Sequence, residues 1–130
     1  MADKKGTGLL MVWCDVLEEQ EDEFNRWYNS EHIAEILNVP GVIDAARYEA
    51  VVNGPKHLAC YELESPAAVL GDGFTKRTKS KWSETMGPTL IGTNFFIPLY
   101  EMIYPYELTD EVANSKMAPA LHVGRINIPA

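Results

Sequence analysis

The sequence predicts an α+β protein with a ferredoxin-like layout, in which two helices cover one side of a four-stranded antiparallel sheet. Two observations carry this prediction. Strand-like and helix-like patterns follow one another in the order β-α-β-β-α-β, and the outer strands are apolar on both faces. A sheet with two apolar faces would expose more apolar surface than monomers usually do, so we expect two copies to pair into a homodimer.

Length and composition predict a single domain over residues 1–130, with a core at about 8–106 and a C-terminal tail at 107–130. Nineteen acidic against eleven basic residues give a formal net charge of -8, which repels nucleic acids and anionic membranes. No apolar run reaches the roughly 18 residues of a membrane helix, and the N-terminus lacks a signal-peptide pattern. We therefore expect a cytoplasmic protein that binds neither nucleic acid nor membrane.

The first strand and helix follow from simple patterns. The run GLLMVWCDV at 8–16 is apolar on both faces, which is typical of a buried strand. Acidic residues then crowd the start of a helical pattern, where they meet the positive end of the helix dipole. The helix places Phe24, Trp27 and Tyr28 on one face, kinks or restarts near its polar middle, and ends at the NVPG sequence at 38–41.

The remaining elements are a hairpin, a short helix and a last strand. VIDAARYEAVV at 42–52 and HLACYELE at 57–64 flank an Asn-Gly-Pro turn, which indicates an antiparallel hairpin. Ser65 and a following proline cap a helical segment, which a Gly-Asp-Gly sequence interrupts before a further short turn of helix at 83–86. The aromatic stretch at 93–106 predicts a long last strand, whose proline favours an edge or a bulge.

Two longer sequences carry a family resemblance. FNRWYNSEHIAEILNVPGVIDAARYEAV at 24–51 and GPKHLACYELESP at 54–66 resemble the dimeric α+β barrel superfamily, particularly its EthD-like members. The resemblance covers roughly residues 9–104, although this chain has Ala34 where related sequences often carry proline. It implies two sheets paired into a barrel, a pocket between sheet and helices, and small aromatic or polyketide-like ligands.

The functional expectation rests on this resemblance. It implies an enzyme without a cofactor that acts on an aromatic or carbonyl substrate by histidine acid–base chemistry, as an isomerase, cyclase, lyase or monooxygenase. The alternative is a non-catalytic dimer that binds a small apolar molecule, of the kind found among stress-response proteins. A haem site with His32 or His122 as axial ligand is a third possibility.

The candidate catalytic residues are His32, Glu31 and Tyr28. Histidine takes and returns a proton near neutral pH. Adjacent helical residues diverge by about 100°, so Glu31 is a poor partner for His32, and Glu35 or Tyr28 is better placed. The structural alternatives are that His32 braces the helix end, and that Glu31 caps a second short helix or pairs with Arg47.

The candidate substrate-binding residues are mainly aromatic, although such residues are most often simply core. They are Trp27, Trp13, Tyr61, His57 and Phe96, and His57 is expected at an exposed strand start.

Metal binding and disulfide bonding are not expected, because the chain has no metal-ligand spacing and Cys14 and Cys60 lie in apolar runs typical of buried free thiols. A group of basic residues either steers an anionic substrate or forms a solvated loop. It consists of Lys76, Arg77, Lys79 and Lys81.

Overall fold

A computed structural model describes residues 6–103 and 122–124, and it confirms the ferredoxin-like α+β fold. In chain order the elements are β1 (Gly8–Asp15), α1 (Glu18–Trp27), the π-helical turn η1 (Tyr28–His32), α2 (Ile33–Leu37), β2 (Val42–Glu49), β3 (His57–Leu63), the 3-10 turn η2 (Pro66–Val69), α3 (Asp72–Thr75), α4 (Ser83–Met86), α5 (Pro88–Ile91), β4 (Thr93–Phe96) and β5 (Leu99–Glu101).

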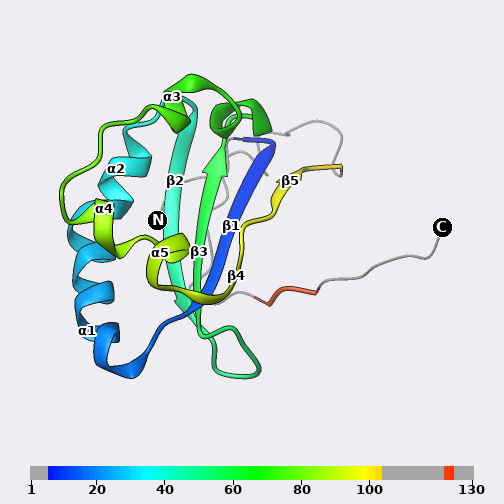
Figure 1. The fold of residues 1–130 in the computed structure, drawn as a ribbon. Helices are drawn as coiled ribbons and strands as arrows, with labels where there is room; N and C mark the ends of the chain where they lie inside the picture. The colour runs from blue at the N-terminus through cyan, green and yellow to red at the C-terminus, as the bar shows by residue number, and fades with distance from the viewer. Residues whose placement is uncertain (1–5, 104–121, 125–130) are drawn as a thin grey trace.

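The sheet is antiparallel, with the strand order β2-β3-β1-β4 and with β5 also paired to β1. The central pair runs in register from Gly8 opposite Leu63 to Cys14 opposite His57. Figure 1 shows the helices gathered on one side of this sheet, while the described segment 122–124 lies on the other side. The two sides of the sheet are therefore covered by different parts of the chain.

The last strand differs from the expectation of one long strand at 93–106. It is divided into β4 and β5, which makes five strands instead of four, and residues 104–106 lie outside the described part. The break falls at Pro98, which has no N–H to donate to the ladder, although its carbonyl still accepts a bond from the Met11 amide at 3.1 Å. β4 lies at the edge of the strand order, as this proline predicts, whereas the division of the strand was not predicted.

The first helix contains a π turn at its polar middle, where a kink was expected. The Ile33 amide donates to the Tyr28 carbonyl five residues back, whereas an α-helical bond spans four. The Ser30 hydroxyl donates to the Arg26 carbonyl, which competes with the backbone for that acceptor. The extra residue shifts the helix phase, so that Ile36 takes the central core position.

The predicted second helix is a series of short segments. Instead of a helix capped by Ser65, η2 is a single 3-10 turn, and the Ser65 side chain makes no capping hydrogen bond. The Gly-Asp-Gly sequence that was expected to interrupt a helix instead contains the start of α3, which begins at Asp72. The short helix at 83–86 is confirmed, and α5 follows it after Gly87. Weak apolar periodicity in this region explains why no long helix forms.

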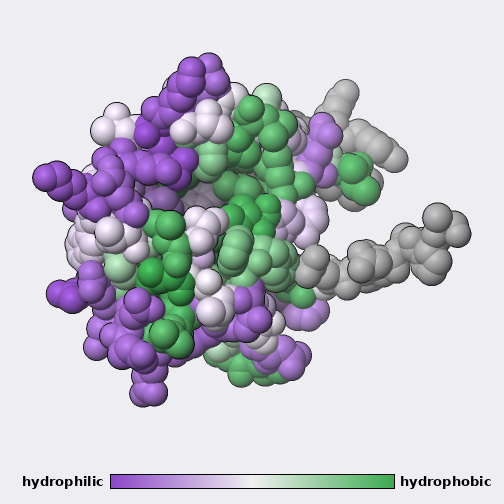
Figure 2. Space-filling view, viewed as in Figure 1, coloured by the Kyte–Doolittle hydropathy of each residue, from purple (hydrophilic) through white to green (hydrophobic). Residues whose placement is uncertain are grey.

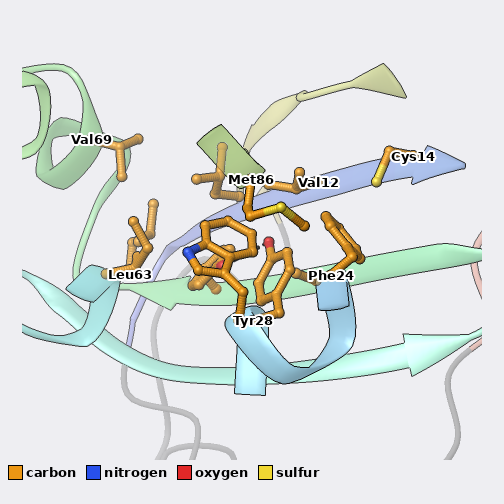
Figure 3. Close-up of a cluster of buried hydrophobic side chains, with 12 residues drawn as sticks. Val12, Cys14, Phe24, Tyr28, Leu63, Val69 and Met86 are labelled. Carbon is orange, nitrogen blue, oxygen red and sulfur yellow. Dashed lines mark hydrogen bonds between the residues drawn. The ribbon is translucent and has the colours of Figure 1, made fainter. Parts of the chain in front are cut away.

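The main core lies between the helices and the sheet. Figure 3 shows Phe24 and Tyr28 from the first helix directed towards Val12 of β1, with Met86 beside them and Leu63 farther along the same core. Phe24, Trp27 and Leu63 are all fully buried. Burying aromatic side chains of this size is the main stabilising contribution, since each removes a large apolar area from water.

The opposite face of the sheet is also partly covered. Met11, Trp13, Leu58 and Cys60 form a second buried cluster, against which Tyr48 and other partly buried side chains pack. This differs from the expectation that the face is bare until a second copy covers it. Exposed apolar side chains remain at its margins, in particular Val51, Val52 and Tyr100.

Three further observations concern the length of β2, the cysteines and membrane-spanning helices. The strand β2 is shorter than predicted, so Val51 and Val52 lie in the hairpin loop. Cys14 and Cys60 are buried free thiols, as predicted. Within the described residues, no helix is long and apolar enough to cross a membrane.

Candidate functional site

A cavity of about 390 Å³ lies between the sheet and the helical segments. Its floor is made by β1 and β3, through Leu10, Val12 and Tyr61, and its walls by the first helix and by the chain from Val69 to Leu99. Figure 2 shows hydrophobic side chains gathered over η2, α5 and β5 beside hydrophilic ones over the helices and the α3–α4 connection. The cavity is therefore largely apolar, with polar groups concentrated on one side, as is usual for small-molecule sites.

His32 and Glu35 form the central polar pair of this cavity. The Nδ1 atom of His32 lies 3.1 Å from Oε1 of Glu35, and both side chains are about nine-tenths buried. The His32 ring stacks on Trp27, with centroids 4.3 Å apart, and meets the edge of Tyr28. Trp27 precedes His32 by five residues, so the π turn between them sets this stacking.

The protonation of the pair follows from its surroundings. Burial opposes ionisation of Glu35, but hydrogen bonds from the Ser83 hydroxyl and the Ser80 amide, together with His32, outweigh it and lower the pKa of this carboxyl. Burial lowers the pKa of His32, and the positive charges of Arg77 and Lys79 lower it further, so that together they outweigh the opposing effect of Glu35. Near pH 7 Glu35 is therefore an acceptor-only carboxylate, and neutral His32 donates its Nδ1–H to it.

The proton assignment leaves one atom of the histidine free. Among the described residues, none hydrogen-bonds to Nε2 of His32. In the tautomer that Glu35 selects, this nitrogen carries a lone pair. It can accept a proton or bind a metal centre.

Two buried tyrosine hydroxyls lie at the cavity wall. The hydroxyls of Tyr28 and Tyr61 are 3.0 Å apart, and both side chains are buried. Burial raises the pKa of both phenols, so both stay protonated. Two hydroxyls carry two hydrogens, but the bond between them uses only one. The second hydrogen has no acceptor among the described residues and is available to a ligand oxygen.

The neighbouring polar groups hold the pair in place. The indole Nε1 of Trp27 donates to Ser83 Oγ at 2.9 Å, and Ser83 Oγ in turn donates to Glu35. Ser80 donates its hydroxyl to Glu31 Oε2 at 2.6 Å. Glu31 is therefore tied to the loop before α4, and it is not part of the cavity wall.

Arg77 and Lys79 supply the positive charges of the wall. The guanidinium of Arg77 lies over the Phe74 ring, 4.3 Å from its centroid, and donates from Nη1 to the Phe74 carbonyl at 2.9 Å. Its Nε atom is buried and has no hydrogen-bond partner within the described chain.

Buried His57 and half-buried Arg47 form a separate cluster beneath α1. His57 is 5% exposed, which corrects the expectation of an exposed strand start. It is held between Glu21, at 3.0 Å, and Arg47, at 3.2 Å. Arg47 lies over Tyr28 and bonds to two asparagines, so it does not pair with Glu31. His57 is outside the walls of the cavity.

Trp13 and Phe96 lie on the opposite face of the sheet. Their rings stack with centroids 4.6 Å apart, and they line a second hollow of about 640 Å³ together with the hairpin loop and His122. The structure therefore brings together Tyr28, His32, Trp27 and Tyr61 of the predicted residues, and separates Trp13, Phe96 and His122 from them.

Sequence reasoning missed part of this site. The helical spacing indicates Glu35 as a possible partner of His32, but nothing in the sequence indicates Ser83, because serine in a short helix has no distinguishing signal. Arg77 and Lys79 belong to the basic group that was noted, and only the folded loop shows which of its members reach the cavity. Within the described residues, no three potential metal-ligating side chains gather into a cluster.

No protein-family model and no curated protein matches the chain. Several solved structures of similar fold do match the chain. A conserved protein from Methanosarcina mazei Go1 is 20% identical, with a TM-score of 0.52 over 76% of this chain and 96% of that one. HapK from Hahella chejuensis is 13% identical, with a TM-score of 0.53 over 75% and 93%. The heme-degrader MhuD from Mycobacterium tuberculosis is 14% identical, with a TM-score of 0.51 over 74% and 95%.

These matches confirm the ferredoxin-like fold, while membership of the EthD-like group stays a prediction. They also correct the expectation of a site without a cofactor. MhuD has this fold and was solved with two hemes bound in its active site. The fold therefore gives no ground for expecting a cofactor-free site, and that expectation is wrong.

Proposed function

We propose that this chain is a small-molecule enzyme that moves a proton at a carbon next to a carbonyl group, with His32 as the base. The observation that carries the proposal is the His32–Glu35 pair in the cavity, which leaves Nε2 of His32 with a free lone pair. Because burial lowers the pKa of His32, the imidazole is neutral at pH 7 and ready to accept a proton.

The groups around the pair support such a reaction. Nε2 of His32 takes a proton from the carbon, and the C–H electron pair moves into the carbonyl to give an enolate. The spare hydroxyl hydrogen of the Tyr28–Tyr61 pair is placed to stabilise the enolate oxygen. Glu35 stabilises the imidazolium that forms, and His32 then returns the proton to the same or another carbon. Isomerases, cyclases and lyases can share these steps.

Deuterium exchange tests the proposal without knowledge of the natural substrate. A panel of apolar and aromatic ketones, including 2-tetralone, is incubated with the protein in D2O, and loss of the α-proton signals is followed by NMR. We expect faster exchange for at least one ketone, and a loss of about 10²- to 10⁴-fold in His32→Gln. His57→Gln is the matched control, since it removes a buried histidine outside the cavity.

Two outcomes would contradict the proposal. If His32→Gln stays folded and retains exchange within about tenfold of the parent, His32 is not the base. If the ketones bind to the cavity and none exchanges, the chain is a binding protein, which is the alternative function.

Haem is a second candidate ligand, suggested by the free Nε2 of His32. The residues present fit the group: Nε2 of His32 would bind the iron, and Arg77 and Lys79 would pair with the propionates. His122 lies on the opposite face of the sheet. Bound haem would supply redox and oxygen chemistry. A Soret band on haem titration that is lost in His32→Gln supports this ligand, and absence of the band rules it out.

We also infer that the chain forms a homodimer through the second face of its sheet. The support is the hollow lined by Trp13 and Phe96, together with the exposed loop residues Val51 and Val52. Sedimentation should show a dimer at micromolar concentration. Val51→Asp with Val52→Asp should weaken it, whereas Leu17→Asp, on an exposed residue before α1, should not. A stable monomer in the parent protein would contradict the inference.

A further inference from the structure

The basic segment between α3 and α4 places two positively charged side chains in the wall of the cavity. Of its four basic residues, Lys76 pairs with Asp72 at 3.4 Å, and Lys81 is not part of the cavity wall. Arg77 and Lys79 do line the cavity. Among the described residues, the charged groups of the wall are thus two cations and the carboxylate of Glu35, beside the neutral His32. This wall carries a net positive charge, although the whole chain carries -8.

The carboxylate of Glu35 offsets only one of these two positive charges. Glu35 already accepts hydrogen bonds from His32, from the Ser83 hydroxyl and from the Ser80 amide. In the part of the chain that the structure describes, neither Arg77 nor Lys79 forms an ion pair. Both therefore remain available to a group that enters the cavity.

Arg77 also has an unmet hydrogen-bonding need. Its Nε atom is buried without a partner among the described residues, which is a costly arrangement for a charged donor. Stacking on Phe74 and the bond from Nη1 hold the guanidinium in one orientation. The Nη atoms of a guanidinium fixed in this way match the planar geometry of a carboxylate, to which they can donate two parallel bonds.

We propose that the ligand of this cavity is an apolar acid, whose carboxylate is bound by Arg77 with Lys79 beside it and whose hydrocarbon part lies on Leu10, Val12 and Leu99. This inference names the substrate class of the proposed site and so rests on the proposed function. The positive wall also steers such an anion to the cavity, because the rest of the acidic chain repels it.

A pair of matched probes tests the inference. 2-Naphthoate and 2-naphthamide have the same rings and nearly the same shape, but only the first carries a charge. Calorimetric titration of the intact protein should show naphthoate binding at least about tenfold more tightly, since a hydrogen bond to a charged group contributes more than a neutral one. Added salt should reduce this preference.

Variants assign the preference to Arg77. Arg77→Gln should abolish it, whereas Lys81→Gln removes the same charge from the same segment and should retain it. Arg77→Lys keeps the charge but not the two-bond fork, so it should give an intermediate value. Thermal melts check that each variant is folded. If Arg77→Gln does not fold, Arg77→Lys serves as the readout in its place.

Three results would overturn the inference. These are equal affinity for the acid and the amide, no binding of either probe, and an equal loss in Arg77→Gln and Lys81→Gln. Such results leave the deuterium exchange of neutral ketones unaffected. Conversely, a clear preference for the acid without any exchange would mean that the site binds acids but that the proposed proton transfer is wrong.

Discussion

The cavity beneath the helices and the hollow on the opposite face of the sheet share strand β1 but differ in their walls. Alternate residues of this strand face the two spaces, with Val12 on one side and Trp13 on the other. The cavity adds a buried histidine–carboxylate pair and two cations, whereas the hollow adds Glu49, His122 and exposed valines. The sheet thus provides a similar apolar floor to both spaces, and the segments that cover each face provide the charged and titratable groups.

The free energy of unfolding should differ most between a variant in the wall of the cavity and a variant in the wall of the hollow. Trp27→Ala should lower the free energy of unfolding by about 3–5 kcal/mol, because it empties a fully buried position and leaves Ser83 without its donor. Val51→Ala, at an almost fully exposed wall of the hollow, should change it by less than about 0.5 kcal/mol. Urea denaturation measures both. Similar losses would show that the hollow is as tightly packed as the cavity.

Acid–base behaviour should give an intermediate difference. Glu35 raises the pKa of His32, so Glu35→Gln should move the acid limb of the exchange rate to lower pH. It should also reduce the rate by about tenfold or more, because the tautomer and the imidazolium lose their partner. Glu49→Gln, in the hollow, should change neither quantity. An unchanged pH profile in Glu35→Gln would remove Glu35 from the mechanism.

The dependence of stability on pH should give the smallest difference. Burial lowers the pKa of both His32 and His57, so each binds a proton more readily in the unfolded chain. Their contribution is therefore fully present above about pH 6.5 and is lost as the pH falls through their folded pKa values. The difference between the urea midpoints at pH 7.5 and pH 5.5 should be smaller in a variant with both histidines changed to glutamine than in the parent protein. An equal difference would mean that other groups control this range.

The sequence was sufficient for the strands and their order, because continuous apolar runs and a turn signal depend on local chemistry. The edge position of the last strand was also foreseen from the missing N–H of Pro98, but the division of that strand into two was not. Of the four short segments between Pro66 and Ile91, the helix at 83–86 was foreseen, whereas the starts of α3 and α5 were not, since their positions depend on packing against the sheet.

Apart from Tyr61 on β3, the site was predictable where its residues share one helix. Tyr28, His32 and Glu35 lie within two turns, so helical geometry brings them together. Ser83 and Arg77 come from a distant segment with weak periodicity, and their approach is decided by the tertiary fold. Trp13 and Phe96 were assigned to the same pocket because aromatic character does not tell which face of a sheet a residue occupies.

The π turn at 28–32 makes the site sensitive to chain length as well as to residue identity. Removing one residue there would restore an ordinary α-helix and rotate everything after it by about 100° relative to Trp27. His32 would then leave its stacking partner, even though every side chain of the site were kept. Insertions and deletions in this helix, more than substitutions, are therefore the changes by which descendants of this chain would gain or lose its chemistry.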